Sequence, residues 1–366
     1  MGGLQIDTEA CRGRQQRLVE QMKLLEVDVV IVRRPEHVQW LAGTRFAWVF
    51  QSAAALTVDG RLTLVAPQDP GEAAADEVLT YEAKWHSTLR NDQSQTCNEV
   101  LEREISAACR GKILGVEFSC FGHHWTTESR RLVDMEPPLY RLRRRKDKDE
   151  LKMLRKAIAG TARMYEKARE IICPGVSELV VFNELQSAAV KEFGEMLTGT
   201  GNDYQCASRG GPPRGERLAA AGELYILDLG PAFRGYFADN ARTIAVSSPT
   251  DEQQEAWSHV IAVLEHVQRT VRPGESAKSL FEDAARMLKE APVGVFNHHL
   301  GHGIGLFPHE APHLNPNWDD TFEEGDVFTA EPGLYAPELR AGMRIENDFL
   351  VTADGVELLT DFDLSL

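Results

Sequence analysis

The sequence predicts an α/β (α+β) protein with two domains, and three observations support this. The chain has 366 residues, more than a single domain usually contains. Residues 1–140 alternate helical and β-branched segments, a pattern typical of a mixed sheet covered by helices. Residues 141–366 run twice through two helices followed by strands, which hints at internal pseudo-symmetry. We therefore expect one domain over residues 1–140 and a second over residues 141–366.

Local spacing and turn chemistry predict each element of the first domain. Leu18, Met22 and Leu25 recur at helical intervals, residues 27–32 (VDVVIV) are β-branched, and Asp59-Gly60 is a strong hairpin signal. Pro137-Pro138 is expected to end a helix. Helices are predicted at residues 11–26, 92–108 and 121–134, and strands at residues 27–32, 53–58, 62–66, 81–85 and 112–117.

The second domain begins with a basic run, RLRRRKDK, at residues 141–148. We interpret this run as a solvated crossing into a charged helix, rather than as a patch for an anionic partner. Pro174-Gly175 closes that helix, Ser177 is an N-cap signal and Thr250-Asp251 begins a later helix. Helices are predicted at residues 147–172, 178–193, 249–271 and 277–289. Strands are predicted at residues 224–229, 235–246, 327–331, 344–352 and 356–359, with one strand followed by a loop within 195–216.

Composition excludes several classes of function. The net charge of −16 provides no basic footprint, so we expect no nucleic-acid partner. No run of about 18 apolar residues is present, so we expect no membrane span. The N-terminus lacks the apolar core of a secretory signal, and the six cysteines form no CxxC pair. Free thiols in the cytoplasm are therefore expected.

Residues 296–310, FNHHLGHGIGLFPHE, concentrate the chemistry of the chain. They contain His298, His299, His302 and His309, four of the eleven histidines. The interleaved glycines allow the backbone to pass close to a bulky or charged group. Because a neutral imidazole is the commonest metal ligand, this density of histidines indicates a metal site.

Four carboxylates, Asp228, Asp239, Glu331 and Glu346, stand inside apolar, strand-like runs. A buried carboxylate is costly without a partner, so one of them could be an ordinary ion pair but four indicate a bound cation. Asp228 and Asp239 are eleven residues apart, and Glu331 and Glu346 fifteen, so short returns would place each pair side by side. With one imidazole, this set suits two divalent ions that share bridging carboxylates.

The chain resembles the pita-bread metallopeptidases (peptidase family M24), which include methionine aminopeptidase, aminopeptidase P, prolidase and creatinase. The matching motifs contain Asp228 in LDLG, Asp239 in GYFADNART, His302 in HLGHGIGL, Glu331 in TAEPGLY and Glu346 in RIEND. The run EPGLY…GMRIENDFLVT is most similar to the proline-peptidase branch. The resemblance implies a creatinase-like N-terminal α/β domain and a C-terminal pita-bread domain with a curved, mainly antiparallel sheet covered by helices.

The resemblance also implies the metal ligands. Asp228 would bind one ion, His302 and Glu331 the other, and Asp239 and Glu346 would bridge the two. A metal-bridging hydroxide would attack the scissile carbonyl while Glu331 moves the proton. Manganese is the first expectation for both ions, with cobalt, zinc or iron as alternatives.

Three further residues match catalytic positions of the family. His298 would contact the substrate, His309 would stabilise the tetrahedral intermediate, and Arg344 would orient the bridging carboxylates. Each also has a structural alternative, as a packed histidine or a plain ion pair. His299 matches no family role, and we predict that it is structural or solvent-facing.

Three carboxylates near these motifs stay outside the ligand set. Asp203 and Asp348 are predicted to form hydrogen bonds or caps rather than to bind metal. Glu310 is expected to pair with a site histidine or with a backbone group.

One departure from the family pattern bears on the substrate. Proline-specific members carry a substrate-binding histidine five residues after the Asn of a Gly-x-Asn segment. Here Ala207 stands five residues after Asn202, and Arg209 or Gln205 would have to supply the missing donor.

Three functions therefore stay open. The first is a metallo-exopeptidase, an Xaa-Pro dipeptidase (prolidase) or aminopeptidase acting on small peptides as a cytoplasmic homodimer. The second is a pita-bread enzyme on a small non-peptide substrate, such as a creatinase-like amidinohydrolase or a lyase. The third is a non-catalytic binding module on the same fold.

Overall fold

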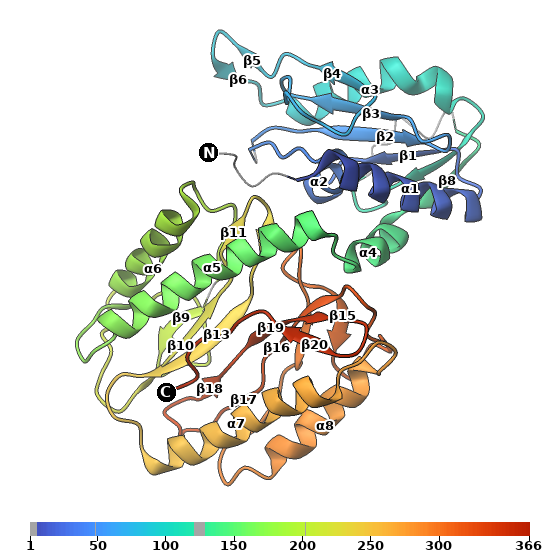
Figure 1. Ribbon diagram of the computed structural model, residues 1–366. Coiled ribbons are helices and arrows are strands. Elements are labelled where there is room, and N and C mark those ends of the chain that lie inside the picture. The colour runs from blue at the N-terminus through green and yellow to red at the C-terminus, as the bar shows by residue number, and fades with distance from the viewer. Residues whose placement is uncertain (1–5, 48, 121–128, 202) are drawn as a thin grey trace. The chain divides into compact units, whose positions relative to one another are not determined.

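The computed structural model describes residues 6–47, 49–120, 129–201 and 203–366. The chain forms two compact units, Met1–Arg143 and Arg144–Leu366 (Figure 1). Within the described ranges, no helix combines the length and the apolar character that a bilayer crossing requires.

A six-stranded mixed sheet forms the centre of the first unit. Its elements are α1 (Thr8–Leu24), β1 (Val29–Val32), α2 (Pro35–Ala42), β2 (Ala53–Thr57), β3 (Leu62–Ala66), β4 (Glu77–Thr80), β5 (Lys84–Trp85), β6 (Thr88–Leu89), α3 (Gln93–Cys109), β7 (Ile113–Val116), β8 (Arg131–Asp134) and α4 (Glu136–Arg144). The strand order is β4-β3-β2-β1-β7-β8, with both parallel and antiparallel pairs, and β5 and β6 form a separate hairpin. The mixed sheet and the β2–β3 hairpin around Asp59-Gly60 confirm the prediction.

Three predictions in the first unit differ from the structure. Of the helix predicted at residues 121–134, residues 121–128 lie outside the described residues, and Arg131–Asp134 instead form β8, parallel to β7. Pairing with an open sheet edge satisfies the backbone there, which outweighs the local helical pattern. Pro137 and Pro138 begin α4 rather than end a helix, because the first turn does not use the N–H that proline lacks. The strand predicted at residues 81–85 is shifted, because the parallel register with β3 runs from Glu77 to Thr80.

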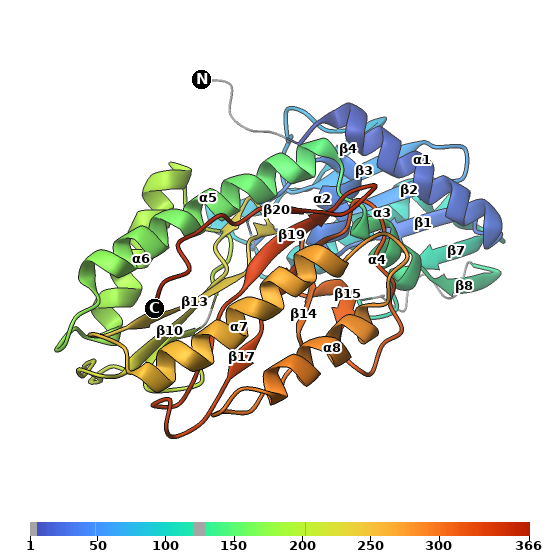
Figure 2. The same cartoon turned by 60° about the horizontal axis from the view of Figure 1, so that its bottom comes forward.

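The second unit places two pairs of helices over its two larger antiparallel sheets, and two further pairs of short strands form separate two-stranded sheets (Figures 1 and 2). Its elements are α5 (Lys148–Ile171), α6 (Glu178–Phe193), β9 (Asp203–Cys206), β10 (Leu224–Leu229), β11 (Ala232–Phe233), β12 (Tyr236–Phe237), β13 (Asn240–Ala245), α7 (Asp251–Thr270), α8 (Ala277–Lys289), β14 (Gly301–Gly303), β15 (Glu310–Leu314), β16 (Val327–Ala330), β17 (Gly333–Leu334), β18 (Met343–Arg344), β19 (Asn347–Val351) and β20 (Val356–Leu358). Helices α5 and α6 pack on the sheet β13-β10-β9, and α7 and α8 on β15-β14-β16-β19-β20. This order confirms the predicted two rounds of helix, helix and strands.

The two sheets of the second unit are joined where β13 passes β18 and the start of β19. The Thr243 hydroxyl bonds the Arg344 carbonyl and accepts from the Arg344 N–H, both at 2.9 Å. Two residues away on each segment, the Glu346 N–H donates to the Ala241 carbonyl at 2.9 Å. The predicted curved antiparallel sheet is therefore built from two sheets, and their junction carries Glu346.

The strands predicted at residues 235–246 and 344–352 are each interrupted once. The first breaks at Asp239, between β12 and β13, and the second at Glu346, between β18 and β19. A residue in a regular ladder alternates faces with its neighbours. Leaving the ladder lets Asp239 and Glu346 turn toward each other from different sheets.

The basic run at residues 141–148 is not fully solvated as predicted. Arg144 is buried and donates to both carboxylate oxygens of Asp326, at 3.0 and 2.6 Å. Lys146 is buried and bonds Glu310 at 3.2 Å. The interpretation as a solvated crossing is therefore wrong for Arg144 and Lys146, because acidic partners from distant segments compensate the two charges.

Candidate metal centre

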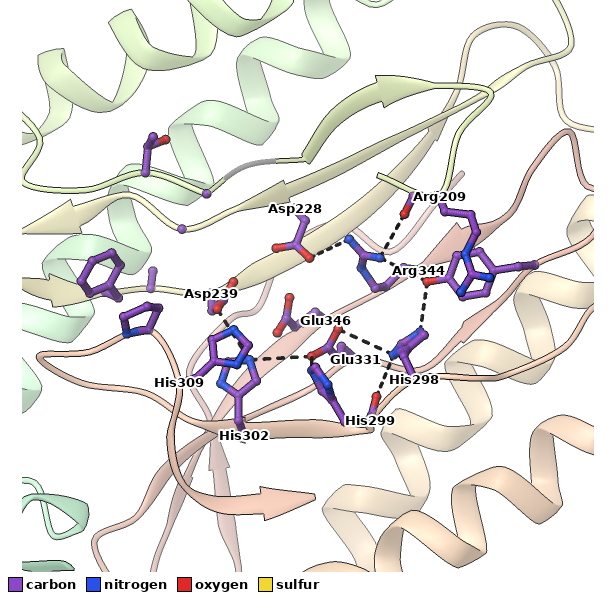
Figure 3. A pocket seen from close by; sticks show the side chains of 17 residues that line it. Arg209, Asp228, Asp239, His298, His299, His302, His309, Glu331, Arg344 and Glu346 are labelled. Carbon is purple, nitrogen blue, oxygen red and sulfur yellow. Dashed lines mark hydrogen bonds and ion pairs between the residues drawn. The ribbon is translucent and has the colours of Figure 1, made fainter. Parts of the chain in front are cut away.

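A cavity of about 400 Å³ in the second unit brings the predicted site residues together (Figure 3). Its wall contains Asp228, Asp239, His298, His302, His309, Glu331, Arg344 and Glu346. Thr200, Arg209, His299 and Tyr335 add further polar groups to its lining. The first eight residues come from six separate segments, so only folding makes them neighbours.

Asp228 and Asp239 meet because β10 and β13 return on each other. The register of these strands places Asp228 opposite Ala241, and Asp239 directly precedes β13. One carboxylate oxygen of each lies within 4.8 Å of the other and of an oxygen of Glu346. The pairing across a short return that the sequence predicts is present.

Glu331 and Glu346 occupy the equivalent positions in the other sheet. Glu331 directly follows β16, and Glu346 directly precedes β19, where Asn347 pairs with Ala330. Glu346 is fully buried, and within the described part of the chain neither of its carboxylate oxygens has a hydrogen-bond partner. A buried, ionised carboxylate without a partner is strongly unfavourable, so the geometry of Glu346 fits a compensating group such as a cation.

The ionisation of the cluster leads to the same conclusion. Burial raises the pKa of Asp228 to about 6, although the attraction of Arg344 opposes the rise. Burial, and then the charges of neighbouring carboxylates, raise the pKa of Asp239 and of Glu346 well above the usual range. A divalent cation among these oxygens would offset both the burial and the repulsion, so the residues present fit hard, oxygen-preferring ions.

His302 presents the correct ring nitrogen for metal binding. Its Nδ1 lies 3.1 Å from the Gly303 carbonyl, which can only accept, so Nδ1 carries the proton. The unprotonated Nε2 faces Asp239 Oδ2 at 3.8 Å and Glu331 Oε1 at 3.7 Å. Burial lowers the pKa of His302 to about 3, which keeps the ring neutral, the form that binds metal.

His309 lies on an exposed loop and stacks on His302. The ring centroids are 3.7 Å apart and the planes differ by 12°. A ring nitrogen of His309 lies within 4.8 Å of ligand atoms of Asp239 and His302. The ring therefore reaches the mouth of the carboxylate cluster from the side opposite Arg209 (Figure 3).

His298 lies at the end of a hydrogen-bond chain that starts at Arg344. Its Nδ1 donates to the His299 carbonyl at 2.7 Å, so its Nε2 accepts from the Tyr335 hydroxyl at 3.0 Å. Arg344 in turn donates to the Tyr335 oxygen at 3.2 Å. Burial lowers the pKa of His298 to about 4, consistent with a neutral ring in this chain.

Arg344 is buried and binds two carboxylates through Nη2. It donates to Asp228 Oδ2 at 2.7 Å and also bonds Asp203. The resemblance implies that Arg344 orients the bridging carboxylates, whereas the hydrogen bonds found here reach Asp228 and Asp203. Asp203 forms hydrogen bonds as predicted, and it accepts a further one from the Gly211 N–H at 2.7 Å.

His299 lies in the site, although it matches no role in the family pattern and was predicted to be structural or solvent-facing. Its Nε2 is 2.6 Å from Glu331 Oε1. Burial alone would raise the pKa of Glu331, but the hydrogen bond and charge of His299 hold it at about 2. The same contact raises the pKa of His299 against the effect of burial. No strand covers residues 296–300, so side-chain alternation could not have predicted which histidines face inward.

The segment after β9 carries the residues that could replace the histidine of the proline-specific members. Ala207 does not line the cavity, and the Gln205 amide is used by the Pro212 carbonyl at 2.7 Å. Arg209 does line the cavity. Of the two donors that the sequence left open, the structure places Arg209 in the site.

A buried ion pair supports the loop that carries His309. Lys146 and Glu310, whose side chains are 1% and 8% exposed, are 3.2 Å apart. Glu310 also accepts from the Phe307 N–H at 3.1 Å, across the loop. Glu310 therefore acts on the loop backbone, one of the two roles expected from the sequence.

Replacing Lys146 by methionine should therefore lower stability and activity together. Removing one partner of a buried ion pair costs about 3–5 kcal/mol, because a charge is left behind in the interior. Lys148→Met, an exposed neighbour, is the matched control. Chemical denaturation and kcat/KM of both variants test this, and equal stabilities would contradict the assigned support.

The chain matches two family models. Residues 152–353 match metallopeptidase family M24, and residues 14–144 match the creatinase/prolidase N-terminal domain. Together with the fold, these matches define a two-domain metallopeptidase. Since the first match alone covers more than half of the chain, the protein belongs to metallopeptidase family M24. Membership in a metallopeptidase family implies divalent metal ions.

Similar proteins cover nearly the whole chain. An uncharacterized peptidase of Staphylococcus aureus (strain MW2) is 29% identical over 361 residues, 95% of this chain and 98% of the relative. The Xaa-Pro dipeptidase from Bacillus anthracis has a TM-score of 0.81 at 23% identity, covering 97% of this chain and 99% of that one. The prolidase from Pyrococcus furiosus has a TM-score of 0.76 at 24% identity, covering 94% and 99%. These likenesses confirm the predicted creatinase-like domain followed by a pita-bread domain.

Proposed function

We propose that the protein hydrolyses the peptide bond before proline, as an Xaa-Pro dipeptidase or Xaa-Pro aminopeptidase. We further propose that two divalent ions are held by Asp228, Asp239, His302, Glu331 and Glu346. The observation that carries the proposal is the buried, unpartnered carboxylate of Glu346 beside two other carboxylates. The names of the structurally similar proteins, Xaa-Pro dipeptidase and prolidase, suggest the substrate.

Each residue of the site then has a distinct role in the proposed reaction. Ions bound at the five ligands would activate water and polarise the scissile carbonyl. Glu331 stays ionised beside His299, so it can accept the proton that water loses. His309 reaches the cluster from an exposed loop, where its ring N–H can donate to the oxyanion as negative charge develops.

His298 and Arg344 are part of the hydrogen bonds that keep the side chains of the site in fixed orientations. The neutral ring of His298 is fixed by the Tyr335 hydroxyl and the His299 carbonyl. Arg344 keeps the Asp228 carboxylate facing the cavity. Such fixed orientations reduce the reorganisation that the reaction would otherwise require.

Metal binding should raise the thermal stability of chelated protein. A cation that binds only the folded state at 100 times its Kd adds about 2.7 kcal/mol, or roughly 5–10 °C in Tm for a unit of this size. Scanning calorimetry with Mn²⁺, Co²⁺ or Zn²⁺, against potassium chloride at equal ionic strength, measures the shift. No shift with any of these ions would contradict the proposed centre and favour a non-catalytic module.

A substrate panel tests the proposed reaction. We expect metal-loaded protein to cleave Ala-Pro, Gly-Pro or longer peptides with proline second, and to leave Ala-Ala largely intact. Creatine and related small guanidino compounds belong in the panel, because the absence of an imidazole at Ala207 favours a non-peptide substrate as the second candidate. Turnover of creatine alone would replace the peptidase proposal.

Two expectations from the sequence remain proposals. We propose a cytoplasmic location, which the six free cysteines support. A homodimer is expected from the resemblance. Sedimentation of the metal-loaded protein in an analytical ultracentrifuge would give the mass of the assembly directly.

A further inference from the structure

Of the two arginines that line the cavity, Arg209 has no acidic partner among the residues that the structure describes. The other arginine there, Arg344, is bound by Asp203 and Asp228. Across the described ranges of the chain, no carboxylate forms an ion pair with Arg209. Its Nη2 instead donates to the Asn297 side-chain oxygen at 2.5 Å, a neutral group. Arg209 is exposed at the cavity rim, so its charge is available to a ligand.

The guanidinium of Arg209 is held in place on two sides. It stacks on Tyr335, with Cζ 4.1 Å from the ring centroid. The bond to Asn297 fixes its rotation about that contact. A planar guanidinium prepared in this way loses little entropy on binding a carboxylate, to which it can donate two parallel hydrogen bonds.

The backbone of Arg209 is fixed beside the candidate metal ligands. Its carbonyl accepts from Arg344 Nη1 at 3.3 Å, while Arg344 Nη2 binds Asp228. The next residue, Gly210, has φ of 136°, and a Cβ there would lie 2.1 Å from Asp203 Oδ2. Only glycine allows this close turn, which folds the segment back along β9 and keeps Arg209 at the rim.

The cavity therefore has an acidic end and a basic end. Asp228, Asp239 and Glu346 form the first, and Figure 3 shows Arg209 and His309 on opposite sides of the carboxylates. One chain of contacts, through Tyr335 and His298, connects Arg209 to the Glu331 side of the cluster. A small peptide with its scissile bond at this cluster, next to the ions that the carboxylates are proposed to hold, and with its own carboxylate near Arg209 complements this arrangement.

We propose that Arg209 binds the α-carboxylate of a dipeptide, so that the enzyme is a dipeptidase rather than an aminopeptidase for longer chains. This rests on the proposed peptidase function and names its substrate class. In a dipeptide the carboxylate follows the scissile bond by one residue, which spans only about 3.5 Å. The volume of about 400 Å³ is at the small end of the range for ligand pockets, as a dipeptide requires.

Kinetics of Arg209→Gln on Ala-Pro and on its C-terminal amide test the subsite. Wild type should prefer the acid to the amide. The substitution should lower kcat/KM for the acid about 10- to 100-fold, mainly through KM, and change the amide less than about threefold. Arg269→Gln, an exposed arginine on α7 outside the cavity, is the matched control. Equal rates for acid and amide in wild type would overturn the proposal.

Equilibrium binding separates this inference from the peptidase function. The probe is a reduced Ala-Pro analogue, with a methylene in place of the scissile carbonyl, prepared as acid and as amide. Calorimetry with metal-loaded protein should show tighter binding of the acid, and Arg209→Gln should remove that preference. If wild type binds both forms equally, the carboxylate subsite is wrong. If the preference is present but no peptide is cleaved, the subsite stands and the peptidase proposal fails.

Discussion

Asp239→Asn should abolish metal binding and activity together. The Asp239 carboxylate is the member shared by two ligand clusters, one with Asp228 and Glu346 and one with His302 and His309. An amide in its place cannot supply the negative charge that a bridging ligand needs. We expect kcat/KM to fall by at least about 10³-fold, in the range found when a catalytic group is removed.

The same substitution should not lower the thermal stability of the metal-free protein. Asp239 is surrounded by like charges, and burial with those charges raises its pKa well above the usual range. Replacing it by a neutral isostere removes part of that repulsion. Chelated Asp239→Asn should therefore unfold at the same temperature as chelated wild type, or higher.

Two measurements decide this prediction. Metal content after dialysis and the Tm shift on adding Mn²⁺ should both be lost in Asp239→Asn. Asp361→Asn, an exposed aspartate outside the cavity, should retain both. A variant that keeps its metals and its rate would show that Asp239 is not a ligand, and the proposed centre would have to be abandoned.

His309→Gln should retain metal but lose rate. His309 is exposed and stacks on His302, whose Nε2 already faces the carboxylates. As a donor to the oxyanion, His309 would contribute only in the transition state. Its loss should lower kcat by about 10²–10³-fold with little change in KM.

Metal content distinguishes this role from that of a ligand. A His309 nitrogen lies within 4.8 Å of ligand atoms of Asp239 and His302, so a liganding role is the direct competitor. His313→Gln is the control, because His313, which lies on β15, is bound by Asp320 and is outside the cavity. Loss of a metal ion from His309→Gln would assign His309 to the metal and reject the oxyanion role.

Local signals predicted most of the elements. Ser177 caps α6 by accepting from the Leu179 N–H, and Thr250 caps α7. These are interactions between residues two or three apart, which sequence spacing reveals. The order of the candidate ligands along the chain was equally visible, because each carboxylate stood out against an apolar strand.

Predictions failed where a distant partner changed the outcome. Arg131–Asp134 form a strand because β7 offers an open edge. Lys146 is buried because its charge is paired with that of Glu310, which lies far along the chain. His299 reaches Glu331 because the backbone before β14 is irregular. None of these contacts is encoded in a local pattern.

The sequence by itself determined the fold class, the caps and hairpins, and the residue types able to bind divalent ions. Those features depend on periodicity and on charge, which are properties of short segments. Only the tertiary structure decided that Glu346 is left without a partner, that Arg344 binds Asp228, and that Arg209 rather than Gln205 faces the cavity. Each of these depends on which distant side chain satisfies a charge in the interior, and that becomes defined only when the two sheets of the second unit are packed together.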